Sequence, residues 1–471
     1  MHSDKPSSGG TVTPRLVIHG GAGNIVRHGF PVDKYEQYRT SLLKIVTRTH
    51  AYMTTPICDA KNAAAHGSPS MSGPRLPSAL AVATHAVVQL EDDPLFNSGR
   101  GAVFTRDGIN QLEASVMVSR GFRKRGVGVM GLRHVRNPVR LARAMLEHGE
   151  QDLGGRGADE LEPSLSSLPS LDVPSAQGHT QIYGEAAEQL ARAYGCAMVE
   201  PTYFFTKQRW DEHVRALEKE RQGRSAGGTW AADEYLPQGT CGAVAMDEHG
   251  VVCAATSTGG MTNKLTGRVG DTPVPGAGFW AEEWTESGDP TAIPTRTPWE
   301  RLVRSARAPI ELTGSLRGFL ADCLPTPFLY TPVASHGAAL TTTRCLAASG
   351  TGNGDSFLRV NAVRTVAAMA QWKPEAAADA LRAVVGPGGT LQQSAGDRWG
   401  VTGEGEGGMI GIEGVVTRDA QGEVVATRGE ILMSYNCGGM YRAWIDDAGR
   451  PVMSIWSNTT HDEMPDSDHF E

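Results

Sequence analysis

Two short apolar runs around a polar turn give the clearest structural signal in the chain. Residues 243–246 (AVAM) and 251–255 (VVCAA) flank the turn 247–250 (DEHG). Short apolar runs bounded by turn residues are typical of buried strands, so we expect a β-hairpin here. Residues 216–238, just before it, are charged, dotted with Gly and Ser, and without apolar periodicity. We expect these residues to form a loose tether.

The rest of the pattern mixes helical and strand-like segments, assigned from the spacing of apolar residues. Helices are expected at 34–53, 78–91, 137–148, 184–195, 356–371 and 374–385. Strands are expected at 16–19 (ended by the glycines of 20–23), 112–117, 126–130, 341–349, 409–416, 422–434 and 440–456. Residues near 55–77, 150–180 and 284–340 are rich in Pro, Ser or Gly, or lack a period, and are interpreted as insertions. Sheets and helices packed in layers, of the α+β or α/β class, fit this order.

Composition narrows the function. The 471 residues are 40% hydrophobic, enough for one large or several ordinary domains. The net charge is −8 with no basic stripe, which argues against nucleic acid or an anionic membrane surface as partners. Seven scattered Cys form no CxxC pair and the 14 His form no HExxH pattern, so a zinc or other catalytic metal site is not expected. Without an apolar leader or a run of 18 apolar residues, a cytoplasmic location is expected.

The junction between tether and hairpin carries the main chemical prediction. It has the sequence Gly239-Thr240-Cys241-Gly242. If the bond before Thr240 is cut, this residue becomes an N-terminal nucleophile whose α-amine serves as the base for its own hydroxyl. The hairpin would also bring its far end, Thr256-Ser257-Thr258-Gly259-Gly260, close to Thr240, because antiparallel neighbours bring their ends together. An ordinary polar strand end is the alternative for that segment.

A second motif could bind a zwitterion. In residues 267–273 (GRVGDTP), Arg268 and Asp271 stand three apart in a loop constrained by Gly and Pro. A guanidinium suits a carboxylate and an Asp suits an ammonium, so together they match the two ends of an amino acid. The alternative is a surface ion pair of little energetic value.

Two Gly-rich loops are candidates for stabilising negative charge. Residues 350–355 (GTGNGD) precede a predicted helix, where backbone N–H groups can hold an oxyanion, and no GxxxxGK[ST] pattern indicates a phosphate loop. Asn97, in residues 95–101 (LFNSGRG), could donate an amide hydrogen bond. A turn-forming Asn and a plain strand–helix turn are the alternatives.

Taken together, several segments resemble the plant-type asparaginase/isoaspartyl peptidase family of N-terminal-nucleophile hydrolases. They are LVIHGGAGNI at 16–25, LEDDPLFNSGRGAVFT at 90–105, LEASVM at 112–117, the whole of 239–283 and SGTGNGD at 349–355. The resemblance implies a four-layer αββα sandwich and a self-cleaving amidohydrolase for L-asparagine or β-aspartyl peptides. It also implies an α subunit, 1–239, with insertions near 55–77 and 150–180 and a mobile tether at 216–239. The β subunit would be 240–471, with an insertion near 284–340.

The resemblance also implies a role for individual residues. Thr240 would be the nucleophile, released by cleavage after Gly239, and Thr258 would orient it. Arg268 would hold the substrate carboxylate and Asp271 its ammonium, beside Gly352 and Gly354. The Thr351 hydroxyl and Gly352 N–H would form the oxyanion hole, with Asn97 assisting.

No cofactor is implied for catalysis. A structural sodium ion would be held by the backbone carbonyls of Leu90, Glu91, Asp93, Phe96, Ser98 and Arg100. The partners would be a small amide or short peptide and a second αβ pair. Asn353-Gly354-Asp355 departs from the usual asparaginase sequence toward glycosylasparaginases, so a glycosylasparaginase-like or specialised amidase stays open. So does an inactive binding homologue.

Overall fold

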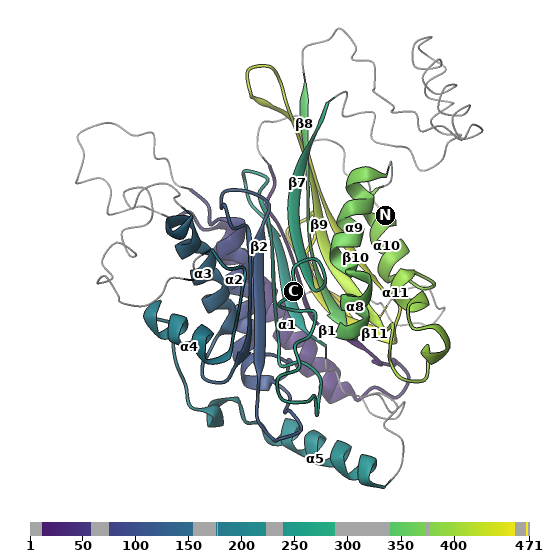
Figure 1. Cartoon of the computed structure of the whole chain (residues 1–471). Helices are drawn as coiled ribbons and strands as arrows, with labels where there is room; N and C mark the ends of the chain where they lie inside the picture. The colour runs from purple at the N-terminus through teal and green to yellow at the C-terminus, as the bar shows by residue number, and fades with distance from the viewer. Residues whose placement is uncertain are drawn as a thin grey trace, which may run out of the picture.

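The computed structural model describes residues 12–57, 75–153, 176, 178–222, 239–287, 340–373, 376–456 and 468–469. Within them the chain is α+β, with helices and two β-sheets (Figure 1). The helices are α1 (Val32–Thr54), α2 (Ala79–Asp92), α3 (Pro138–Asp152), α4 (Gly184–Ala193), α5 (Lys207–Arg221), α8 (Gly354–Val360), α9 (Ala362–Trp372), α10 (Ala377–Val385) and α11 (Thr390–Gln393).

Among the described residues, the larger sheet has nine strands in the order β13-β12-β11-β1-β5-β6-β2-β3-β4, and the smaller has four in the order β10-β9-β8-β7. The strands are β1 (Arg15–Gly23), β2 (Leu112–Val118), β3 (Gly126–Leu132), β4 (Gln181–Tyr183), β5 (Cys241–Met246), β6 (Val252–Thr258), β7 (Phe279–Ser287), β8 (Thr341–Gly352), β9 (Gly407–Arg418), β10 (Val424–Tyr435), β11 (Gly439–Ile445), β12 (Pro451–Ser454) and β13 (Asp468–His469).

Three apolar clusters pack these elements together. One joins α1, α2 and α3 to one face of the nine-stranded sheet, and a second contains residues from both sheets. The third joins α9 and α10 to the four-stranded sheet. Figure 1 accordingly shows α2 and α3 on one side of the strands, and α9 and α10 on the other.

The predicted hairpin is confirmed as β5 and β6, paired in antiparallel register from Cys241 with Ser257 to Met246 with Val252. β5 is the central strand of the nine, so the nucleophile candidate lies at the end of a strand with a neighbour on each side. The helices expected at 34–53, 78–91, 137–148, 184–195 and 374–385 are present, and Pro138 opens α3, where its missing N–H costs no hydrogen bond.

Several predicted boundaries were wrong. β1 continues through the glycines of 20–23, because they pair with β11 across a register shift between His19 and Gly21. Residues 284–287 belong to β7 rather than to an insertion. The helix expected at 356–371 breaks at Asn361, which adopts a left-handed conformation with φ of 47°. The strand expected at 440–456 is two strands joined by a turn.

The predicted start of the tether, at residue 216, was also wrong. Residues up to Arg221 belong to α5, whose N-terminus is capped by the Thr206 side chain. The buried side chains of α5 are Arg209, Glu212 and His213, and they are polar. A search for apolar periodicity therefore misses this helix. Residues 223–238 lie outside the described residues, as do 58–74, 154–175 and 288–339 within the three expected insertions.

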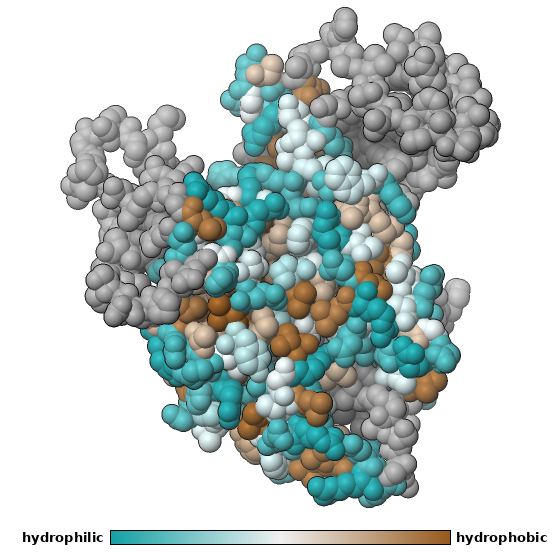
Figure 2. All heavy atoms as spheres, in the orientation of Figure 1, coloured by the Kyte–Doolittle hydropathy of each residue, from teal (hydrophilic) through white to brown (hydrophobic). Residues whose placement is uncertain are grey.

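No helix in the described part of the chain combines the length and apolar character that crossing a bilayer requires. Figure 2 shows a face on which hydrophilic residues are widespread and hydrophobic residues lie in small groups among them.

Candidate active site

Strand alternation decides which side chains face the space between the two sheets. On β5, Cys241, Ala243 and Ala245 belong to the cluster under the helices, whereas Val244 and Met246 belong to the cluster shared by the sheets. Because successive residues of a strand point to opposite faces, Thr240 and Gly242 lie on the inter-sheet side. The same parity puts Thr258 of β6 and Thr351 of β8 on the facing surfaces.

Thr240 lies just before β5 and is 6% exposed. Its Oγ1 is 3.4 Å from Oγ1 of Thr272. It borders a cavity of about 20 Å³, enough for roughly one water molecule. The cavity is lined by Glu113, Thr240, Thr258, Gly260, Met261, Arg268, Gly270, Asp271, Gly352, Asn353 and Gly354. The structure thus brings most of the predicted site residues to one place.

Gly239 packs tightly against β1. A Cβ at this position would lie 2.3 Å from Gly21 Cα and 2.4 Å from the Ala22 backbone N. Those contacts are with backbone, which cannot move aside, so only glycine fits. The residue before the candidate nucleophile is therefore held against the glycine-rich part of β1.

Thr258 lies across from Thr240 if the register of β5 and β6 is continued by one position. Within the described residues, its Oγ1 accepts a hydrogen bond from Gly260 N at 3.0 Å rather than bonding to Thr240. The hydroxyl beside Thr240 instead belongs to Thr272, which the sequence reasoning did not single out. The orienting role expected for Thr258 stays a prediction.

Arg268 and Asp271 both border the cavity, as their spacing predicted. The Arg268 side chain is 19% exposed and its Nη2 donates to Asp355 Oδ1 at 2.8 Å. Asp271 is buried, and within the described residues its Oδ2 accepts no hydrogen bond. Burial raises the pKa of Asp271 to about 7, and the Arg268 charge opposes that rise. A Cβ on Gly354 would lie 2.5 Å from Asp271 Oδ1, so glycine is needed for this packing.

The oxyanion candidates come from the end of β8. Thr351 is fully buried and its Oγ1 has no partner among the described residues. Gly352 has φ of +138°, and a Cβ there would lie 2.4 Å from Gly407 Cα. Asn353 caps α8, its Oδ1 accepting from Ser356 N at 3.0 Å. A buried, unpartnered hydroxyl next to a glycine N–H is the kind of donor pair that a developing oxyanion needs.

Asn97 is fully buried in the loop that follows α2. Its Nδ2 donates to Gly260 O at 2.7 Å and its Oδ1 accepts from Val103 N at 3.1 Å. The amide thus ties its own loop to the residues just after β6. Direct help to the reaction stays a prediction, because these two hydrogen bonds place Asn97 as a bridge between backbone segments.

The same loop turns its backbone carbonyls into a crowded space. A Cβ on Gly99 would lie 2.3 Å from Glu91 O, and one on Gly101 would lie 2.1 Å from Phe96 O. Backbone carbonyl oxygens are ligands that hard cations take, but four of the six expected here, those of Leu90, Asp93, Phe96 and Ser98, accept backbone hydrogen bonds. The sodium site therefore stays a prediction. Arg209, fully buried, already donates to Leu95 O and Gly101 O, which are not among the six expected ligands.

A buried polar chain underlies β5 and was missed by the sequence analysis. His19 Nε2 is 2.7 Å from Ser349 Oγ, which is 2.9 Å from Thr256 Oγ1. Burial lowers the pKa of His19 to about 3, so the ring is neutral. A Cβ on Gly242 would lie 2.2 Å from Ser349 Oγ, so this chain requires the glycine of the Gly-Thr-Cys-Gly motif.

Glu113 also reaches the site, with Lys264 paired to it, and neither residue was predicted. Glu113 lines the cavity and Lys264 Nζ donates to its Oε1 at 3.1 Å. The available signal was Glu113 itself, a charged residue in the mostly apolar strand at 112–117. Buried carboxylates are rare without a partner.

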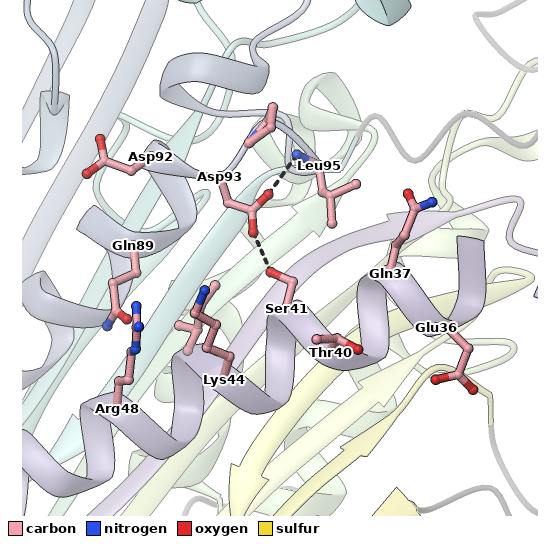
Figure 3. Close-up of a pocket in the computed structure, with 12 residues that line it drawn as sticks. Glu36, Gln37, Thr40, Ser41, Lys44, Arg48, Gln89, Asp92, Asp93 and Leu95 are labelled. Carbon is pink, nitrogen blue, oxygen red and sulfur yellow. Dashed lines mark hydrogen bonds between the residues drawn. The ribbon is translucent and has the colours of Figure 1, made fainter. Parts of the chain in front are cut away.

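A larger hollow, of about 720 Å³, lies elsewhere, between α1 and the end of α2 (Figure 3). None of the residues that line it lines the cavity beside Thr240. Asp93 there accepts from Ser41 and from Leu95 N, so its carboxylate is engaged within the protein. The convergence of polar groups expected of a catalytic site is at Thr240, despite the smaller volume.

Comparisons with known proteins show the family to which the chain belongs. The asparaginase family matches residues 12–172 and 172–287. The isoaspartyl peptidases of Salmonella typhimurium and Escherichia coli are each 36% identical over 266 residues, covering 56% of this chain and 69% and 67% of theirs. The plant-type L-asparaginase of Pyrobaculum calidifontis is 34% identical over 234 residues, which are 49% of this chain and 66% of that protein. The chain belongs to the asparaginase family and is a hydrolase of the N-terminal-nucleophile type.

Proposed function

We propose that the chain cleaves itself between Gly239 and Thr240 and then hydrolyses the side-chain amide of L-asparagine and the β-aspartyl bond of isoaspartyl peptides. The observation that carries this proposal is the meeting of Thr240, Arg268 and Asp271 around one cavity. The relatives named isoaspartyl peptidase and plant-type L-asparaginase support the substrate class.

In the proposed reaction, the free amine of Thr240 takes the proton of its own hydroxyl as the oxygen attacks the amide carbonyl. The negative charge that forms on the carbonyl oxygen is met by the Thr351 hydroxyl and the Gly352 N–H. Losing one such donor typically raises the barrier by about 2.7–4 kcal/mol. The ammonia or amine of the substrate leaves with the proton that the Thr240 amine had taken. Water then hydrolyses the ester on Thr240, which releases L-aspartate and restores the hydroxyl.

Self-cleavage would use the same hydroxyl on the carbonyl of Gly239. The N→O acyl shift forms an ester at Thr240, which water hydrolyses. The described cavity holds about one water molecule, too little for an amino acid. Cleavage would free the amine, and the cavity would have to widen before a substrate enters.

Arg268 would hold the substrate α-carboxylate and Asp271 its α-ammonium. The guanidinium has five N–H groups, and Asp355 takes a hydrogen bond from Nη2. The Oδ2 of Asp271, which accepts no hydrogen bond from the described residues, is an acceptor available to an ammonium donor. The spacing of the two groups on one loop would match a free amino acid or an N-terminal β-aspartyl residue.

The remaining features of the proposal concern assembly. Helices on both outer sides of two facing sheets support the four-layer αββα sandwich, with an α subunit of 1–239 and a β subunit of 240–471. The carbonyls of Leu90, Glu91, Asp93, Phe96, Ser98 and Arg100 would hold a structural sodium ion, which takes no part in the chemistry. No cofactor is needed for the proposed reaction, and two αβ pairs would form the working dimer.

The nucleophile is tested by replacing Thr240. Thr240→Ala should leave one full-length chain and no amidase activity, and Thr240→Ser should retain some of both activities because it keeps a hydroxyl. The exposed Thr390→Ala serves as the control. Mass spectrometry should find a mature fragment that begins at Thr240; an active enzyme with the backbone intact at this point would refute the proposal.

The substrate is tested on matured enzyme. Ammonia release from L-asparagine and amine release from β-aspartyl dipeptides and from a glycosylated asparagine separate the proposal from the glycosylasparaginase-like alternative. Arg268→Ala should raise KM while self-cleavage persists. An unchanged KM would remove Arg268 from the substrate site.

A further inference from the structure

Glu113, which lines the proposed substrate cavity, forms a buried ion pair that has no role in the reaction described above. Lys264 Nζ lies 3.1 Å from Glu113 Oε1, and the two side chains are 2% and 1% exposed. The ammonium also donates to Gln111 O at 3.1 Å. Burying two charges is costly unless they are paired and hydrogen-bonded, so this pair is a specific feature of the site rather than a solvated surface contact.

Register places Glu113 in line with the nucleophile. Glu113 on β2 pairs directly with Thr258 on β6, and Thr258 lies across from Thr240 by continuation of the β5 and β6 register. Directly opposed residues of antiparallel strands point to the same face. The three side chains therefore form a row across three strands on the inter-sheet side, and all three line the cavity.

Glu113 and its strand hold the loop that carries the substrate clamp. Glu113 Oε2 accepts a hydrogen bond from Gly270 N at 3.1 Å, immediately before Asp271. One residue before β2, Gln111 Oε1 accepts from Gly267 N at 2.8 Å, immediately before Arg268. The loop is thus fixed next to each of its two clamp residues by a side chain from the start of β2.

Charge connects Glu113 to Asp271 as well. The groups that face Asp271 are Arg268 from its own loop, Glu113 from β2 and Asp355 from α8. Burial is the main reason for the raised pKa of Asp271, Arg268 opposes it, and Glu113 and Asp355 add to it. Together with Lys264, which pairs with Glu113, the charged groups are two cations, Arg268 and Lys264, and three anions, Glu113, Asp271 and Asp355. When Asp271 is ionised, the excess of negative charge around it favours a ligand that brings an ammonium group there.

We propose that Glu113, held by Lys264, is a positioning residue that fixes the 267–271 clamp loop and makes the site selective for a substrate with a free α-ammonium group. This inference rests on the proposed function. Glu113 acts through the Gly270 N–H and through its charge, and it does not take a proton or form a bond in the reaction.

The test uses matured enzyme and competitive inhibition by L-aspartate, the proposed product, so that clamp binding is measured apart from the chemistry. Glu113→Gln removes the charge but keeps an acceptor. Self-cleavage should persist, and the inhibition constant at pH 8 should rise about tenfold. The acid limb, which is the pH range in which L-aspartate binding weakens on acidification, should move down by about half to one pH unit. The reason is that a negative neighbour of Asp271 is gone.

Two further variants make the result specific. Glu113→Asp keeps the charge but is too short to hold both Lys264 and Gly270, so it should weaken L-aspartate binding without moving the acid limb. Glu413→Gln breaks another buried ion pair, which Glu413 forms with Arg344 in the four-stranded sheet. It should change neither L-aspartate binding nor the acid limb. If Glu113→Gln does not fold, Glu113→Asp decides.

The inference is overturned if folded Glu113→Gln binds L-aspartate as wild type does, with the same acid limb. It is also overturned if Glu413→Gln weakens binding equally, or if Glu113→Asp leaves binding unchanged. A wild-type enzyme that matures but neither hydrolyses asparagine or β-aspartyl dipeptides nor binds L-aspartate would instead refute the proposed function, without any variant being needed.

Discussion

Asp271→Asn should make the protein more stable at alkaline pH while removing its ability to hold an ammonium group. Asp271 is buried, and within the described residues its Oδ2 accepts no hydrogen bond. Burial raises its pKa from the ordinary value of 3.8 to about 7. An Asn of nearly the same shape carries no charge and so avoids the cost of an ionised group in this position.

The direction of the pH effect follows from which state holds the proton more tightly. Below pH 3.8 the carboxyl is protonated in both the folded and unfolded chain, so it contributes no difference. As the pH rises toward 7, the unfolded chain releases the proton first, and folding stability is lost progressively. Above the folded pKa the loss is complete. At 1.36 kcal/mol per pKa unit, the difference between 3.8 and about 7 corresponds to about 4 kcal/mol.

The measurement is urea unfolding of Thr240→Ala with and without Asp271→Asn, since Thr240→Ala keeps a single uncleaved chain. Fluorescence of the nine Trp can follow the transition. At pH 8.5 the Asn variant should be more stable by about 2–4 kcal/mol, with the gap narrowing toward zero near pH 4. Asp397→Asn, at a side chain that is 95% exposed, should change stability by less than about 0.5 kcal/mol at both pH values. A gap that does not vary with pH, or an Asn variant that is less stable at pH 8.5, would refute the reasoning.

Three other predictions follow from the same structure. The kcat/KM for asparagine should rise about tenfold from pH 6 to pH 8, because only ionised Asp271 accepts from the ammonium and its pKa is about 7; a flat profile would contradict this. Gly242→Ala should lower the free energy of unfolding by about 1–3 kcal/mol and slow self-cleavage on gels, because its Cβ would lie 2.2 Å from Ser349 Oγ; an unchanged urea midpoint would argue against the close packing. Arg209→Met should cost about 3–5 kcal/mol and expose α5 to limited proteolysis, because Glu212 would be left buried without its counter-charge; protection equal to wild type would show that α5 does not depend on this pair.

Helix and strand positions could be predicted where the pattern is local and apolar. The β5 and β6 hairpin and helices such as α1 and α2 were found because each buries an apolar face that recurs at its own period. The end of α5, residues 216–221, was taken for tether because the buried side chains of this helix are polar. Among them, Arg209 is held partly by backbone carbonyls far away in sequence. The break at Asn361 was missed because the apolar pattern continues on both sides of one left-handed residue.

The site was predicted unevenly for a similar reason. Arg268 and Asp271 could be paired because a single loop carries both, and Gly352 and Gly354 because their loop stands before a helix. Glu113 and Lys264 are 151 residues apart, and nothing in either segment says that the two charges meet. Likewise the hydroxyl recorded beside Thr240 belongs to Thr272, although the hairpin by itself had pointed to Thr258.

The sequence by itself determined the alternation of apolar residues, the Gly-Thr junction at the end of a buried strand and the motifs of the asparaginase family. Tertiary structure decided which strands are neighbours, and hence that Thr240, Thr258 and Glu113 form one row that borders a cavity with Gly352. Strand parity is local and can be counted along the chain, whereas pairing partners and register depend on contacts between distant segments. The raised pKa of Asp271 has the same origin, because it reflects burial and charges that only folding brings together.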